Sequence, residues 1–165
     1  MSIPSQTIVE PYRNFRYLLE IDGFASAGFN KVSGIDTELD VIDYREGGEN
    51  VIQRKLPGQA KFSPLVVERG ATFNLDMWNW YQSIVSYGGT PGLLIARKTV
   101  NIVLIGHNNK RLREWTAQNA WPSKWEIGDL DAKANEVLIE RMTIQHEGLV
   151  SPSKPVADDL VTPNP

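Results

Sequence analysis

A long polar connection between two strand-like segments constrains the fold of this chain more than any other feature. The connection lies within Tyr44–Gly70, YREGGENVIQRKLPGQAKFSPLVVERG, and a new strand starts at Leu65. Compact domains rarely keep about twenty polar residues marked by Gly and Pro between two strands unless the segment has a function. We therefore predict that residues 44–64 form an arm that projects from the domain.

Length and composition place the chain among ordinary globular domains. Its 165 residues suit one domain with a real core, which we place at residues 1–150, followed by a Pro-rich tail at residues 151–165 that has no core of its own. The net charge of -3 argues against a nucleic-acid-binding protein, which would need a basic patch, and we predict no sequence-specific nucleic-acid binding. The absence of Cys excludes disulfides, thiolate metal sites and Cys nucleophiles.

The chain has no run of about eighteen apolar residues, so we predict no membrane span. Its first residues, MSIPSQTIVEPYRNF, lack the basic and apolar regions of a signal peptide. These features predict synthesis in the cytoplasm.

Alternating β-forming residues predict six or seven strands and one helix. The strands are expected at Phe15–Ile21, Ile35–Tyr44, Leu65–Gly70, Val100–Ile105, Leu112–Ala120 and Asn135–Glu147, with a corner at WPSKWE. Turns rather than helices join neighbouring strands, so the sheet should be mainly antiparallel. The predicted fold is mainly β: a β-sandwich or small barrel with a single packed helix and a projecting hairpin arm.

The predicted helix runs from about Leu75 to Ser86, with Asn74 or Thr72 as its N-terminal cap. Its polar residues form one narrow stripe, and the remaining face is apolar: Met77, Trp78, Trp80, Tyr81, Ile84 and Val85. This face is wide for one small sheet to cover. Either another chain covers part of it, or the helix is well buried within one domain.

No motif in the sequence indicates an enzyme. His107 and His146 do not lie at metal-ligand spacing, and we expect each to be solvated or hydrogen-bonded. The Gly47-Gly48 pair has acidic flanks and lacks the Lys-Ser/Thr of a phosphate loop, and Asp129 and Asp131 offer too few ligands for a calcium loop. No nucleophile elbow occurs, although the members of a Ser-His-Asp site can come from anywhere in a chain. We predict no catalytic residue, no metal and no cofactor.

Ten short blocks of the sequence form a recognisable set: Pro11–Phe15, Leu19–Gly23, Phe29–Ile35, Tyr44–Asn50, Arg54–Gly58, Glu68–Gly70, Trp78–Trp80, Asn119–Trp125, Asn135–Val137 and His146–Leu149. Together they resemble the tube proteins of contractile phage tails and of phage-tail-like contractile injection systems. They span about residues 9–150 in order. The arm block and the NAWPSKWE block look most like the injection-system branch.

The resemblance implies the fold of tail tube proteins and of the haemolysin-coregulated protein of type VI secretion. Six copies would form a ring, and stacked rings would form a tube with a continuous β-barrel lumen. The implied partners are a contractile sheath, a baseplate or tube initiator, a tape measure, a terminator or cap, and luminal cargo, either DNA or effector proteins. A secreted ring-forming carrier of effectors is the other function that the resemblance leaves open.

Three groups of residues are then candidate assembly sites. The arm is expected to reach the neighbouring ring through Arg45, Glu46, Gly47, Gly48, Glu49, Asn50, Arg54, Lys55, Leu56 and Pro57. The strands Ile35–Tyr44 and Asn135–Glu147 are candidates for the lumen wall, with Asp36, Glu38, Asp40, Arg141, Thr143 and Gln145 facing the cargo. Aromatic anchors in the core or at subunit interfaces are expected at Trp78, Trp80, Trp121 and Trp125.

Overall fold

The computed structural model describes residues 16–22, 28–45, 47–48, 53–86, 96–106, 109–131, 133 and 136–151. Within these ranges the elements are β1 (Tyr17–Ile21), β2 (Lys31–Ser33), β3 (Thr37–Tyr44), β4 (Arg54–Phe62), β5 (Leu65–Gly70), α1 (Asp76–Ser86), β6 (Lys98–Ile105), β7 (Arg111–Ile127), β8 (Ile139–Gln145) and β9 (Gly148–Val150).

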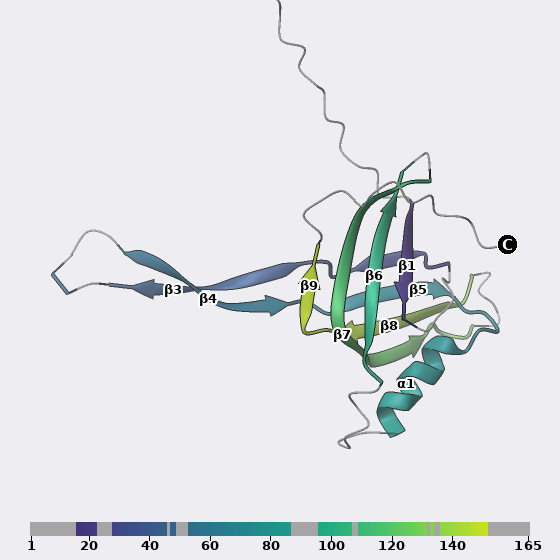
Figure 1. Cartoon of the computed structure of the whole chain (residues 1–165). Helices are drawn as coiled ribbons and strands as arrows, with labels where there is room; N and C mark the ends of the chain where they lie inside the picture. The colour runs from purple at the N-terminus through teal and green to yellow at the C-terminus, as the bar shows by residue number, and fades with distance from the viewer. Residues whose placement is uncertain are drawn as a thin grey trace, which may run out of the picture.

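Seven strands form one bent antiparallel sheet in the order β1-β6-β7-β8-β5-β2, with β9 added alongside β7 (Figure 1). Strand β7 joins the two halves, because its first part pairs with β6 and its second part, Trp121–Ile127, pairs with β8. The change of partner coincides with a positive φ of 51° at Asn119 and a bulge between Pro122 and Lys124. The prediction that the strand ends at a corner at WPSKWE was therefore wrong, since β7 continues through these residues. The antiparallel sheet with one helix is confirmed.

The core lies inside the bend of the sheet. Fully or nearly fully buried side chains come from both halves and from the helix: Leu19, Ile21, Leu65, Val67, Met77, Trp80, Val100, Ile102, Ala117, Ala120, Met142 and Ile144. In β5 and β8 these residues alternate with more exposed ones, as period-2 geometry requires. One face of this half of the sheet is therefore core, and the other face is left for contact with something else.

Helix α1 begins where the sequence predicts. Asn74 Oδ1 accepts a hydrogen bond of 2.8 Å from the amide of Asp76, which gives a partner to a first-turn donor. Met77, Trp80 and Ile84 are buried, and the Trp80 indole donates to the carbonyl of Ala96 at 2.7 Å. The chain itself thus covers the centre of the wide apolar face, whereas Val85 is 55% exposed.

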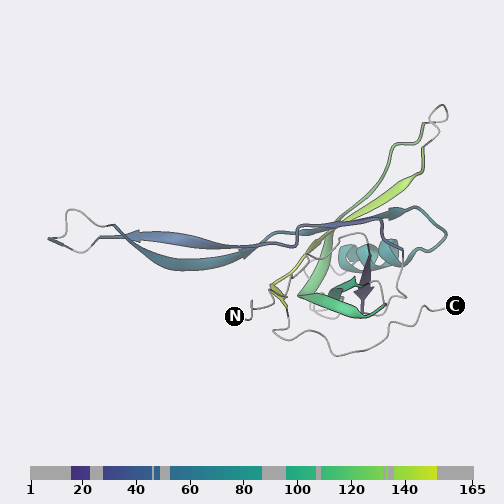
Figure 2. The same ribbon diagram turned by 90° about the horizontal axis from the view of Figure 1, so that it is seen from above.

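Strands β3 and β4 form a separate two-stranded sheet that extends away from the body as an arm (Figures 1 and 2). The arm is longer than predicted, because its paired strands begin at Thr37 and end at Phe62. Two cross-strand ion pairs stabilise it, Lys61–Asp40 at 2.8 Å and Lys55–Asp43 at 3.4 Å. The hydrogen bond from Lys61 to the carboxylate of Asp40 raises the pKa of the ammonium group.

Other boundaries differ by a few residues. The three-residue strands β2 and β9 were not predicted, and β8 begins at Ile139 rather than Asn135. Strand β5 has the predicted bounds. Phe15, His107 and the predicted tail from residue 152 onward lie outside the described residues.

We predict that Gly34→Ala strongly destabilises the subunit. Gly34 lies between β2 and the arm at a φ of +84°, and an added Cβ would lie 2.0 Å from the carbonyl oxygen of Pro64. Backbone strain of this kind costs about 1–3 kcal/mol before the clash is counted. Thermal unfolding should show a lower Tm for this variant. Gly28→Ala is the matched control, since its Cβ would meet nothing within 4 Å; an equal loss in both variants would contradict the prediction.

Candidate assembly surfaces

The face of β8 that points away from the core holds Arg141, Thr143 and Gln145, in the same alternating row that the sequence predicts. Arg141 is paired across the sheet with Glu68 of β5 on one side and Glu126 of β7 on the other. Its guanidinium Nε donates to Glu68 at 2.9 Å. We call this surface the outer sheet face.

Ion pairs continue across the outer sheet face. Lys31 of β2 lies 3.9 Å from Glu68, and Lys124 donates to Glu126 at 2.7 Å. The hydrogen bond from Lys124, together with the nearby Arg141, lowers the pKa of Glu126. The outer sheet face therefore alternates in charge, with each described carboxylate beside a cation.

The acidic residues predicted for the same wall lie elsewhere. Glu38 and Asp40 are on β3, and Asp36 directly precedes it. Strand β3 belongs to the two-stranded arm and not to the seven-stranded sheet. Thr37–Tyr44 pairs only with β4 among the described strands. A single subunit does not test which residues face a lumen, so the luminal positions of both groups stay predictions.

The arm exposes more apolar surface than was predicted from its polar sequence. Its exposed large hydrophobic side chains are Leu39 (52%), Val41 (61%), Ile42 (54%), Tyr44 (44%) and Leu56 (47%). The sequence TELDVIDY indicates this apolar surface, because its apolar residues alternate with acidic ones in a strand outside the core. Arg45, Gly47 and Gly48 flank the turn, and Gly48 has a φ of 100°. Arg54, Lys55, Leu56 and Pro57 open β4, whereas Glu46, Glu49 and Asn50 lie outside the described residues.

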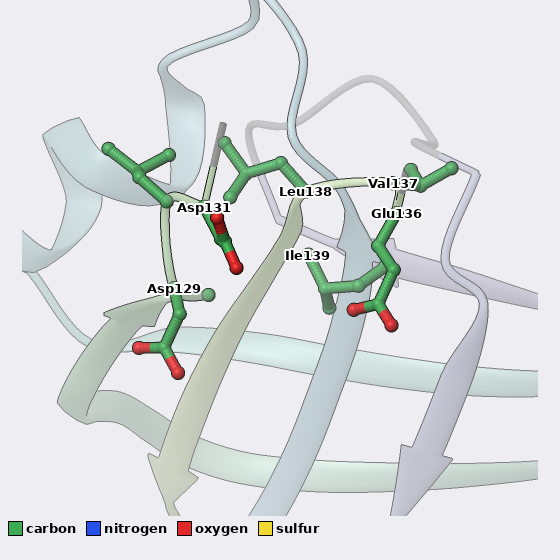
Figure 3. A pocket seen from close by; sticks show the side chains of 8 residues that line it. Asp129, Asp131, Glu136, Val137, Leu138 and Ile139 are labelled. Carbon is green, nitrogen blue, oxygen red and sulfur yellow. The ribbon is translucent and has the colours of Figure 1, made fainter. Parts of the chain in front are cut away.

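On the side of the body opposite the arm, the loops form two hollows. One, of about 500 Å3, is formed by the β7–β8 loop, and Figure 3 shows the side chains of Asp129, Asp131 and Glu136 around it. The other, of about 260 Å3, is lined mainly by Leu75, Trp78, Trp125 and Ile127, with Glu140 beside them. Across the described residues, no group of three or more His, Cys, Asp or Glu side chains is arranged to hold a metal ion.

The predicted aromatic anchors divide between core and surface. Trp80 is 3% exposed and belongs to the core. Trp78 and Trp125 are partly buried and lie edge to face with ring centroids 4.7 Å apart, on the wall of the smaller hollow. Trp121 is partly buried opposite Gln145.

A buried ion pair lies behind the smaller hollow. Arg69 Nε donates to Glu140 Oε2 at 2.8 Å, and both side chains are at most 7% exposed. Arg69 also donates to the carbonyl of Asn74, and the Trp125 indole donates to Glu140 Oε1 at 2.6 Å. Sequence reasoning missed this network, because the partners are 71 residues apart. It fixes the positions of α1 and Trp125 relative to the sheet.

His146 lies near the base of the arm and is hydrogen-bonded, as predicted. Its Nε2 is 3.0 Å from the carbonyl oxygen of Ser63, and its Nδ1 is 3.2 Å from that of Gly148. A neutral imidazole can donate to one of these carbonyls, and an imidazolium to both. In either form His146 links the segment between the arm and β5 to the β8–β9 corner.

A comparison with protein families identifies a family for this sheet with its projecting arm. The family model described as T4-like virus tail tube protein gp19 matches residues 13–150. The chain belongs to this tail tube protein family. The resemblance stated from the sequence blocks is confirmed, and the matched range includes the sheet, the helix and the arm.

Solved structures with the same fold come from contractile injection systems. A chain of the anti-feeding prophage baseplate is 27% identical, with a TM-score of 0.76, and the match covers 88% of this chain and 97% of that one. A chain of an extracellular contractile injection system, in its PVC sheath-tube complex, is 24% identical, with a TM-score of 0.75 and coverage of 88% and 93%. Hcp1 from Flavobacterium johnsoniae shares the fold at 15% identity, with a TM-score of 0.52 and coverage of 87% and 98%.

These neighbours confirm the predicted tail-tube fold, and Hcp1 shares it. No sequence among the curated proteins matches the chain. In the part of the chain that the structure describes, no helix has the length and apolar character needed to cross a membrane. The tail tube family consists of structural tube proteins rather than enzymes.

Proposed function

We propose that this protein is the inner-tube subunit of a contractile injection particle or phage tail. Membership of the tail tube family supports the proposal most directly. Six copies form a ring, and rings stack into a hollow tube that delivers effector proteins or DNA when a sheath contracts. The structural neighbours from the anti-feeding prophage and the PVC complex favour an injection particle over a phage tail.

The exposed sheet edges and the arm give the proposal a physical basis. Among the described strands, β1 and β2 are the edges of the seven-stranded sheet, and ring closure pairs or covers such edges. Ring formation also needs the same head-to-tail contact to repeat from copy to copy until the ring closes. The arm, which pairs with no other described element, supplies the second contact and reaches the neighbouring ring.

The outer sheet face is the lumen wall in this proposal. Its alternating ion pairs, such as Glu68–Arg141 and Lys124–Glu126, give a polar surface without one dominant sign of charge. Such a wall neither holds acidic cargo strongly nor repels it strongly. Asp36, Glu38 and Asp40 of the arm add acidic groups where the arm lies near the lumen.

The proposed partners follow from the assemblies in which the neighbours were solved: a baseplate, a sheath-tube complex, a sheath/tube terminator and a tube-terminating cap. We assign this subunit the corresponding contacts with a sheath, a baseplate or tube initiator, and a terminator or cap, together with a tape measure and cargo. The particle is assembled from protein made in the bacterial cytoplasm. A secreted ring-forming carrier of effectors is the second candidate, because Hcp1 has the same fold.

Electron microscopy of the purified protein tests the tube function. We expect hollow rings at low concentration and long hollow tubes at high concentration. Separate rings that bind an effector and never stack would favour the carrier function. A stable monomer at high concentration, with no rings, would contradict both.

A further inference from the structure

Exposed large hydrophobic side chains gather at two opposite ends of the molecule. Five are on the arm, as described above, and five surround the β5–α1 and β7–β8 loops: Phe73 (105%), Leu75 (58%), Ile127 (45%), Leu130 (82%) and Val137 (76%). Figures 1 and 2 show the arm and these loops on opposite sides of the sheet. One subunit cannot bring its two apolar ends together, so each end is available to a different copy.

The loops at the far end form one continuous surface, which we call the docking hollow. Two backbone hydrogen bonds of 2.8 Å join them, from the amide of Ala71 to the carbonyl of Leu138 and from Gly128 to Ile139. The smaller hollow is lined by Ile127 and Glu140, and the acidic hollow by their chain neighbours Gly128 and Ile139. The floor is fixed by the buried Arg69–Glu140 pair, so the site is built before any partner arrives.

The arm has an apolar face of matching character. Ile42 is directly opposite Leu56 in the hairpin register, and Tyr44 follows Ile42 on the same face. The face is 44% to 54% exposed at these three positions.

The charges of the two ends are also complementary. On the apolar face of the arm, Arg54 of β4 is directly opposite Tyr44 and carries a positive charge, whereas Lys55 and Lys61 are paired with Asp43 and Asp40 within the hairpin. The β7–β8 loop is acidic, with Asp129, Asp131 and Glu136 against Lys133 among its described residues. The two intra-arm ion pairs hold β3 to β4, so the acids of β3 are turned to the lysines of their own hairpin.

We propose that the arm of one copy docks in the docking hollow of a second copy. The Ile42–Tyr44–Leu56 face covers Ile127, Leu130 and Val137, and Arg54, opposite Tyr44 on the same face, lies against the acidic β7–β8 loop. The inference rests on the proposed tube function and names the surface that receives the arm. Because the contact is head to tail, it links copies into an open series from ring to ring.

Complementary variants test the docking surfaces. We expect that Leu56→Asp and Leu130→Asp each abolish stacking, because each removes one half of the contact. An equimolar mixture should give pairs of rings but no longer stacks by analytical ultracentrifugation, since the intact arms of a ring of the second variant can enter the intact hollows of a ring of the first. Val85→Asp, at an exposed position outside both ends, should assemble normally. Circular dichroism confirms that each variant is folded.

A cross-link separates this inference from the tube function. The chain has no Cys, so the double variant Leu56→Cys/Leu130→Cys should form disulfides only between copies, with a ladder that extends beyond six subunits on a non-reducing gel. The control Leu56→Cys/Val85→Cys should form no ladder. Normal tubes without the cross-link, or tubes from Leu130→Asp, would overturn the docking site and leave the tube function standing. A ladder that stops at six subunits would support the docking site but would show that the contact lies within a ring rather than between rings.

Discussion

Removal of residues 49–55 is expected to leave a folded subunit that builds no tubes. The deletion shortens the arm beyond the bulge and removes Arg54 and Lys55, but it touches none of the core residues. We therefore expect a far-ultraviolet circular dichroism spectrum like that of the full chain and a Tm within a few degrees of it. Sedimentation and electron microscopy should show single rings or subunits, with stacking reduced by at least tenfold.

The reason for this large effect is that the arm contributes to assembly rather than to the fold. Its five exposed hydrophobic side chains remain in the deletion variant, and burial of each on a partner is worth about 1.5–3 kcal/mol at most. The deletion removes Arg54 and Lys55, the β4 partners of Tyr44 and Asp43, so the outer end of β3 loses the hairpin pairing that presents its side chains to a partner. A repeated contact multiplies this loss over every ring. Gly28→Ala, outside the arm, is the control, since a Cβ there would meet nothing within 4 Å. Normal tubes from the deletion variant would show that another element stacks the rings.

The sequence predicted the fold where local pattern and tertiary structure agree. Leu65–Gly70 alternates buried and exposed residues along its whole length, and its bounds were predicted without error. Helix α1 has a capping Asn and a 3.6-residue period, and its start was predicted within one residue. In these segments each local preference favours the same structure as the packing.

The misassigned segments are those where packing overrides a local signal. Pro122 suggested a corner because Pro cannot donate to a ladder, but it sits at a bulge where a donor is not needed. Pro57 and Gly58 are poor strand formers, yet pairing with β3 places both within β4, and Gly58 lies where a Cβ would be 3.0 Å from the Asp40 carbonyl oxygen.

The candidate sites were predictable only in part. Arg141, Thr143 and Gln145 share a face because alternation within one strand is a local property. The docking hollow combines residues 71–75 with 127–140, and no local pattern indicates that these segments meet. The Arg69–Glu140 pair was missed for the same reason.

Glu140→Ala is expected to destabilise the subunit by about 3–5 kcal/mol, because it leaves the Arg69 guanidinium buried without its counter-charge. The variant also removes the acceptor of the Trp125 indole hydrogen bond. Urea denaturation of the arm-deleted subunit measures the loss without interference from assembly. The exposed pair Glu68–Arg141 is the matched control, and Arg141→Ala should cost about 0–1 kcal/mol.

The double variant Arg69→Met/Glu140→Leu separates the cost of an unpaired charge from the value of the pair. Replacement of both partners of a buried ion pair by apolar residues of similar volume is often neutral or stabilising. We therefore expect the double variant to recover most of the stability that Glu140→Ala loses. It should still stack poorly, because Arg69 no longer holds the Asn74 carbonyl and Glu140 no longer orients Trp125 on the wall of the docking hollow. A double variant as unstable as Glu140→Ala would show that the network, rather than charge compensation, stabilises this part of the subunit.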